Sequence, residues 1–133
     1  MAQRVTINAE DGHEIGAWRA DPAGAAIGGI VVLHAVFGLT DHMGDVCDGW
    51  AAEGFAAIAP SLFDRVKPGI VNPYGHDGVE AGIKNYLAIP DDQILADIDA
   101  CRAAFSNLGP VAISGFCTGG SWAWTAGAKL TFD

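Results

Sequence analysis

The sequence is short of basic residues. It contains 7 lysines and arginines against 16 aspartates and glutamates, so the formal net charge is −9 over 133 residues. Nucleic-acid-binding domains present a basic patch, and adhesion to anionic membranes also relies on clustered lysine and arginine. We therefore expect neither a nucleic acid nor a membrane as a partner.

The sequence also lacks a long apolar run. A membrane-spanning helix needs about 20 apolar residues. The longest weakly polar stretch, 23–39, covers 17 residues and includes four glycines and His34. Residues 1–6 contain no apolar segment of the kind that forms the centre of a secretory signal peptide. These absences predict a cytoplasmic protein.

Signatures of metal and cofactor binding are missing as well. There is no C-x-x-C pair, no G-x-G-x-x-G and no G-x-x-x-x-G-K-[ST]. The cysteines are odd in number and widely spaced, which fits a reducing compartment better than a disulfide framework. They are Cys47, Cys101 and Cys117. We expect no metal ion and no cofactor.

What the chain does contain is enough apolar sequence for one domain, 1–133. Hydrophobic residues make up 50% of it, which argues against disorder. Alternating apolar residues flank Asp11-Gly12, and this pattern predicts an N-terminal antiparallel hairpin. Continuous apolar runs at 29–33, 55–59 and 111–114 are typical of strands covered on both faces, as in a parallel sheet.

Two of the intervening segments have the spacing of amphipathic helices. One begins near Thr40 and carries its apolar face on Met43, Val46, Cys47, Trp50 and Ala51. The other begins at Pro90 and carries Ile94, Ile98, Cys101 and Phe105. The alternation of strands and helices predicts an α/β fold with a mainly parallel sheet. The segment 61–88, with Pro68, Pro73 and four glycines, is predicted to be a long irregular connection.

The most informative stretch is Gly115-Phe116-Cys117-Thr118-Gly119-Gly120. It follows the last apolar run and precedes a segment of small residues. This order predicts a strand, a tight turn and a helix, the arrangement of the G-x-S-x-G nucleophile elbow with cysteine in place of serine. The glycines are expected to let the turn close without steric collision. A helix N-terminus behind Cys117 favours a thiolate over a thiol.

The chain resembles the dienelactone hydrolase family, a cysteine branch of the α/β-hydrolase fold. The resemblance rests on His34-Ala35-Val36-Phe37-Gly38-Leu39, on Glu53-Gly54-Phe55 through Ala59-Pro60-Ser61-Leu62-Phe63, and above all on the elbow. It implies a three-layer α/β-hydrolase-like fold and hydrolysis of a small-molecule lactone or ester through a Cys–His–Asp triad. It also implies Cys117 as nucleophile and the backbone N–H groups of Val36 and Thr118 as the oxyanion hole.

The chain departs from the family's pattern in two ways. Family members often carry glutamate after the residue that matches His34, and this carboxylate bonds the resting thiol; here the position is Ala35. The triad acid and base follow the nucleophile in the fold's chain order. After Cys117 there is no histidine, and the only acid is Asp133. We therefore expect residues 1–133 to correspond to the front half of such an enzyme, truncated after the elbow and its helix.

Three further residues are candidates for roles at the site. His34, beside the oxyanion loop, and His76, in the long connection, are the candidate stand-in bases; a packed structural histidine is the alternative interpretation of His34. Arg65 is a candidate for binding a substrate carboxylate, and a solvated loop charge is its alternative. Cys47 and Cys101 are expected in the core.

Two functional hypotheses remain open. The first is a cysteine hydrolase of lactones or carboxylic esters, whose missing histidine comes from another chain or from sequence absent here. The second is a catalytically inactive half-protein or assembly module. It would form a homodimer through the strand 111–114, which is expected to present an unpaired edge.

Overall fold

The computed structural model describes residues 1–133, which form five strands, four α-helices and one short 3-10 helix. In chain order the elements are β1 (Gln3–Asn8), β2 (Glu14–Ala20), β3 (Gly29–Leu33), α1 (Asp41–Ala52), β4 (Ala56–Pro60), η1 (Leu62–Arg65), α2 (His76–Leu87), α3 (Asp91–Ala103), β5 (Val111–Gly115) and α4 (Thr118–Lys129). The predicted strands and helices are present, and the hairpin turns at Gly12, whose φ is 87°.

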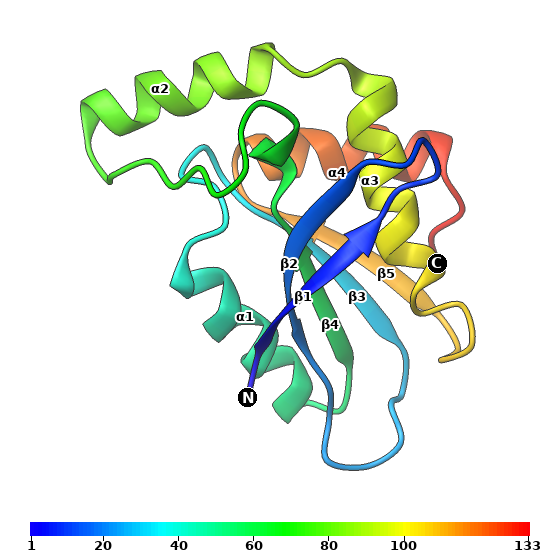
Figure 1. The fold of residues 1–133 in the computed structure, drawn as a ribbon. Helices are drawn as coiled ribbons and strands as arrows, with labels where there is room; N and C mark the ends of the chain where they lie inside the picture. The colour runs from blue at the N-terminus through cyan, green and yellow to red at the C-terminus, as the bar shows by residue number, and fades with distance from the viewer.

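All five strands form one mixed sheet in the order β1-β2-β4-β3-β5 (Figure 1). Strand β2 pairs antiparallel with both β1 and β4, whereas β3 pairs parallel with β4 and with β5. This confirms the predicted sheet, mainly parallel with an antiparallel hairpin at one side. The strands β3 and β4 are fully buried because they are central and covered on both faces.

Helices cover the sheet on both faces, which gives three layers. Along β3, Val31 and Leu33 pack into one apolar cluster while Ile30 and Val32 pack into another. The first cluster includes Ile94, Ile98, Cys101 and Phe105 with Trp122 and Ala126, from the region of α3 and α4. The second includes Met43 and Cys47 of α1. The predicted apolar faces of both helices are therefore confirmed.

The interpretation of 61–88 as an irregular connection is wrong. It contains η1 and the 12-residue helix α2, which lies across the end of the sheet at which β4 terminates (Figure 1). Glycines at 78 and 82 reduce helix propensity and hid this helix from pattern analysis. Both glycines are buried, and neither position has room for a side chain. A Cβ at Gly78 would collide with the backbone of Pro73, and a Cβ at Gly82 with that of Val36. Tertiary packing, not propensity, therefore stabilises α2.

None of these helices has the length and apolar character required to cross a bilayer.

Candidate active site

The turn between β5 and α4 has the geometry of a nucleophile elbow. Cys117 lies at its corner with φ 55° and ψ −115°, and it is the only residue other than glycine with positive φ in the chain. A side chain is strained in this conformation, and such strain is concentrated at functional sites. Cys117 is exposed and unpaired. The corner therefore presents a thiol to solvent at the carboxyl end of a parallel strand.

Two of the three elbow glycines are required by close packing. A Cβ at Gly115 would collide with the carbonyl group of Gly119. A Cβ at Gly119 would collide with the carbonyl oxygens of Leu33 and His34. At Gly120 the nearest atom would lie 3.5 Å away, an ordinary van der Waals distance. The predicted steric need for glycine thus applies to the first two positions and is wrong for the third.

The first turn of α4 lies directly behind Cys117. The Cys117 carbonyl oxygen accepts hydrogen bonds from the N–H groups of Gly120 (2.9 Å) and Ser121 (3.3 Å). The Thr118 N–H donates to no group of the chain, as expected for the first residue of a helix. The Thr118 hydroxyl is also buried without a partner. The helix therefore offers a free backbone donor next to the thiol.

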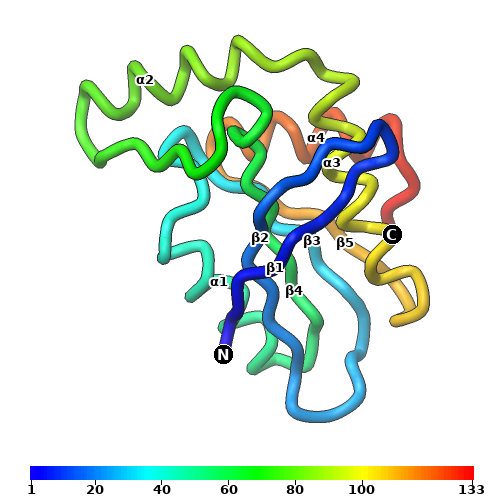
Figure 2. The backbone as a smooth tube through the Cα atoms, in the orientation of Figure 1, coloured from blue at the N-terminus to red at the C-terminus, as the bar shows by residue number.

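The second predicted oxyanion donor lies in the loop 34–38, between β3 and α1. The Val36 N–H has no acceptor in the chain, while its side chain is buried. Figure 2 shows this loop in cyan beside the start of α4 and the segment before α2. The Gly119 contact with Leu33 and His34 joins the elbow to the start of this loop. Neither of the two predicted backbone donors has an acceptor within the chain.

His34 is a structural histidine. It is completely buried, its Nε2 accepts the Leu62 N–H (3.0 Å), and its Nδ1 lies 2.7 Å from the Ala35 carbonyl oxygen, to which it donates. Burial lowers the pKa of His34 to about 4, so the neutral form is favoured. Because both ring nitrogens are engaged, its role as a stand-in base is not supported, and the alternative interpretation from sequence holds.

No contact places His76, the other candidate base, beside Cys117. It is the first residue of α2, its side chain is 93% exposed, and its nearest charged neighbour is Glu80, at 4.0 Å. It does not line the cavity beside the elbow. The histidine that does line it is His42.

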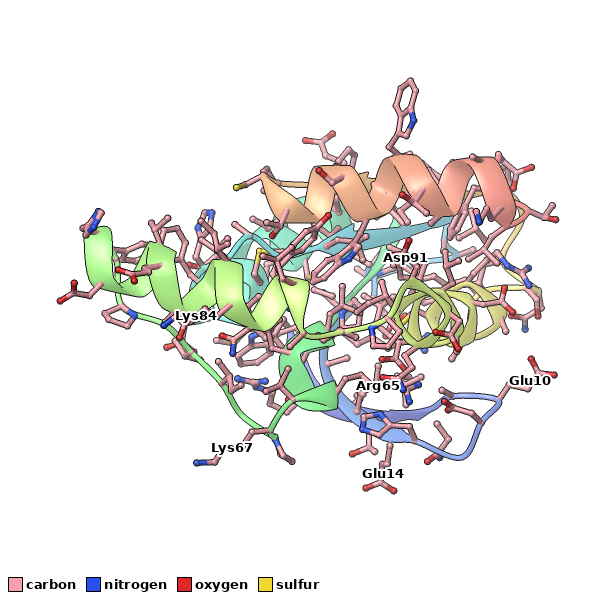
Figure 3. All side chains as sticks on the ribbon, turned by 90° about the horizontal axis from the view of Figure 1, so that it is seen from above. Glu10, Glu14, Arg65, Lys67, Lys84 and Asp91 are labelled. Atoms are coloured by element: carbon pink, nitrogen blue, oxygen red, sulfur yellow. The ribbon has the colours of Figure 1, made fainter.

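Arg65 is engaged by two aspartates, so the prediction that it binds a substrate carboxylate is not supported. Its guanidinium donates to both oxygens of Asp97 (2.7 and 2.9 Å) and to both oxygens of Asp11 (2.7 and 3.1 Å). Only 7% of the side chain is exposed. Arg65 lies between the β1–β2 hairpin and α3 (Figure 3). Its role is to tie η1 to these two elements.

The other two cysteines differ sharply from Cys117. Both are buried, and burial raises the pKa of the Cys47 thiol to about 12. Burial also raises the pKa of Cys101 far above its usual range. Their assignment to the core is consistent with this environment. Of the three thiols, only Cys117 is accessible to a reagent in solution.

A mainly apolar cavity of about 360 Å³ opens beside the elbow. It is lined by Ala35, Phe37, Gly38, Thr40, His42, Met43, Tyr74 and Phe116. Phe37 and Tyr74 stack edge to face with ring centroids 4.6 Å apart. Ala35 lines this cavity and adds no charged group to it. Sequence analysis missed Tyr74, because only folding brings residues 71–74 back to the loop 34–38.

The family model of the dienelactone hydrolases matches residues 15–133. The chain belongs to this family. It is 37% identical over 106 residues to a protein assigned as a carboxymethylenebutenolidase in Synechocystis sp., covering 76% of this chain and 43% of that protein. It is 29% identical over 139 aligned residues to the carboxymethylenebutenolidase of Pseudomonas putida, covering 100% of this chain and 58% of that enzyme.

A solved structure supports the same assignment. A Klebsiella pneumoniae protein assigned as a dienelactone hydrolase superposes with a TM-score of 0.81 at 28% identity, covering 98% of this chain and 55% of that chain. The predicted family and the α/β-hydrolase-like fold class are thus confirmed. The chain spans about half the length of the relatives it matches.

Proposed function

We propose that this chain carries the nucleophile and the oxyanion hole of a hydrolase that cleaves a small-molecule lactone or carboxylic ester. The observation that carries the proposal is Cys117, a strained and exposed cysteine at the corner of a strand–turn–helix elbow. Membership of the dienelactone hydrolase family supports the reaction class. The unpaired cysteines support action in the cytoplasm.

In the proposed reaction the Cys117 thiolate attacks the carbonyl carbon of the substrate. A carbon–sulfur bond forms, and the carbonyl π-electrons move to oxygen, which the Val36 and Thr118 N–H groups stabilise. Collapse of this intermediate expels the alcohol oxygen and leaves a thioester on Cys117. Water then cleaves the thioester, a step that needs a general base.

We propose that the histidine base and its aspartate come from sequence outside these 133 residues. Both ring nitrogens of His34 are engaged, and His76 is exposed at the start of α2. The relatives have the additional length to supply the two groups, since this chain matches 43% of one and 58% of another. Position 35 is alanine, so this place supplies no carboxylate to the thiol.

Acylation with p-nitrophenyl acetate tests this function. We expect a burst of about one equivalent of p-nitrophenolate per chain, slow turnover afterwards, and one acetyl group on the peptide that holds Cys117. The Cys117→Ala variant should lose the burst. Cys47 and Cys101 serve as internal controls, because burial keeps both thiols protonated. Equal, slow modification of all three cysteines would overturn the proposal.

A second candidate is an inactive module that assembles through β5. This strand pairs only with β3. The predicted unpaired edge is wrong at Val111, because its outward N–H and C=O are both bonded to Asp133. Strand residues alternate, so the N–H and C=O of Ile113 also face away from β3, and the proposed edge is confined to this part of the strand. Unpaired edges of this kind promote strand pairing between chains. A stable dimer that shows no burst would favour this candidate, and a monomer in sedimentation at micromolar concentration would contradict it.

A further inference from the structure

The loop 34–38 must hold its Val36 N–H in one orientation if that group is to stabilise an oxyanion. Its first residue, His34, is fixed by hydrogen bonds to Ala35 and Leu62. Its last residue, Gly38, forms a β-bridge with Val71. The Ala35 carbonyl, which shares a peptide group with the Val36 N–H, accepts hydrogen bonds from His34 Nδ1 (2.7 Å) and from the Gly38 N–H (3.2 Å). The next carbonyl, that of Val36, is bound from elsewhere in the chain.

Asn72 supplies that contact. Its Nδ2 donates one hydrogen to the Val36 carbonyl oxygen (2.9 Å) and the other to Oδ1 of Asn85 on α2 (3.0 Å). Its own N–H donates to the carbonyl oxygen of Phe37 (2.9 Å). One residue therefore binds two consecutive carbonyls of the loop, and its amide is itself oriented by a helix.

The helix α2 also contacts the same carbonyl. Gly82 lies so close to Val36 that a Cβ would collide with the Val36 carbonyl oxygen and side chain. Asn85, the partner of the Asn72 amide, lies one turn further along α2. The Val36 carbonyl is thus held between Asn72 and the surface of α2.

We propose that Asn72 is a positioning residue of the oxyanion hole, held in place by Asn85. By fixing the Val36 carbonyl, it fixes the peptide group that follows Val36. The peptide group before Val36 is held through the Ala35 carbonyl, so the backbone of Val36, with its N–H, is kept in one orientation. It does not touch the reacting atoms and is not a catalytic residue. The inference rests on the proposed function, because it concerns the transition state of Cys117 acylation.

Two reactions of the same thiol separate positioning from general structural support. Acylation by p-nitrophenyl acetate passes through a tetrahedral oxyanion and uses the Val36 N–H. Alkylation by iodoacetamide displaces iodide from carbon and forms no oxyanion. The ratio of the two rate constants at Cys117 therefore reports on the oxyanion hole alone, whatever the reactivity of the thiol.

The variants are Asn72→Asp and Asn72→Ala. Asn72→Asp has nearly the same shape but places an acceptor oxygen against the Val36 carbonyl. Loss of an oxyanion donor typically slows a reaction by about 100-fold to 1,000-fold. Since Asn72 orients the donor rather than supplying it, we expect acylation to slow by about 10-fold to 100-fold, with alkylation changing less than about 2-fold.

Thr125→Ala is the matched control, because it removes an exposed side-chain hydrogen bond to Ser121 further along α4. It should leave both rates unchanged. The inference would be overturned if the ratio of acylation to alkylation rates were the same in the Asn72 variants as in the protein without a substitution. The proposed function would remain intact. Loss of the folded state in both Asn72 variants would also overturn the inference. Absence of acylation in the unmodified protein would instead refute the proposed function.

Discussion

The elbow at Cys117 and the loop that carries Val36 are two halves of one proposed oxyanion hole, but different contacts support them. The elbow turn is closed by contact between Gly115 and Gly119, which lie four positions apart. The loop is held by Leu62, 28 positions from His34, and by Asn72, 36 positions from Val36. The elbow is therefore visible as a short motif, whereas the loop's support depends on the remote segment 61–85.

We therefore expect the elbow to tolerate substitution less well than the loop that carries Val36. Gly119→Val places a branched side chain against the backbone oxygens of Leu33 and His34, which cannot move aside. We expect a loss of about 5 kcal/mol in the free energy of unfolding, comparable to the whole stability of a small domain. Circular dichroism during urea unfolding measures it.

Gly127→Val is the control, since nothing lies within 4 Å of a Cβ at this position of the same helix. Its free energy of unfolding should change by less than about 1 kcal/mol. Similar losses in the two variants would contradict the proposed steric role of Gly119.

The second prediction concerns the remote support of the loop. Asp97→Ala removes a completely buried partner of Arg65, the residue that ties η1 to α3. Because the guanidinium stays buried with only Asp11 to neutralise it, we expect a loss of about 4 kcal/mol in the free energy of unfolding. Asp99→Ala, which removes a partly exposed pair with Arg102 on the same helix, should cost less than about 1 kcal/mol in the free energy of unfolding. Equal losses in the two variants would show that the buried Arg65–Asp97 pair contributes no more to stability than the Asp99–Arg102 pair.

The third prediction is a pH dependence that arises at His34. Burial lowers its pKa to about 4, below its ordinary value of 6.5, so the unfolded chain binds the proton more tightly. The stabilisation from neutral His34 is present above pH 6.5 and is lost as the pH falls toward 4. It amounts to about 3 kcal/mol. Urea unfolding at several pH values measures it, and His34→Gln should flatten the curve in this range.

The smallest expected effect tests the strain at Cys117. At the positive φ of Cys117 a residue with a Cβ is strained, and glycine is not. In Cys117→Gly the free energy of unfolding should therefore rise by about 1 kcal/mol, while acylation is lost. Cys117→Ala should lose acylation without the gain in stability, since alanine keeps the Cβ. A destabilised Cys117→Gly variant would indicate that the corner is unstrained.

Pattern analysis predicted the strands, α1, α3 and the elbow because each has a local signature. Apolar runs marked β3, β4 and β5, and helical spacing marked the buried faces of α1 and α3. It failed for α2, where buried Gly78 and Gly82 reduce helix propensity but allow close packing. It also failed for Arg65, because the aspartates that bind it lie 54 and 32 positions away in the sequence.

The sequence by itself determined the family, the sheet and the position of the elbow that carries Cys117, since turn chemistry and apolar periodicity act between neighbouring residues. Only the tertiary structure decided that His34 is neutral and engaged at both ring nitrogens, that Arg65 is paired, and that Asn72 binds the Val36 carbonyl. These outcomes depend on burial and on contacts between distant segments. The physical reason is that desolvation and long-range hydrogen bonding exist only once the chain is folded.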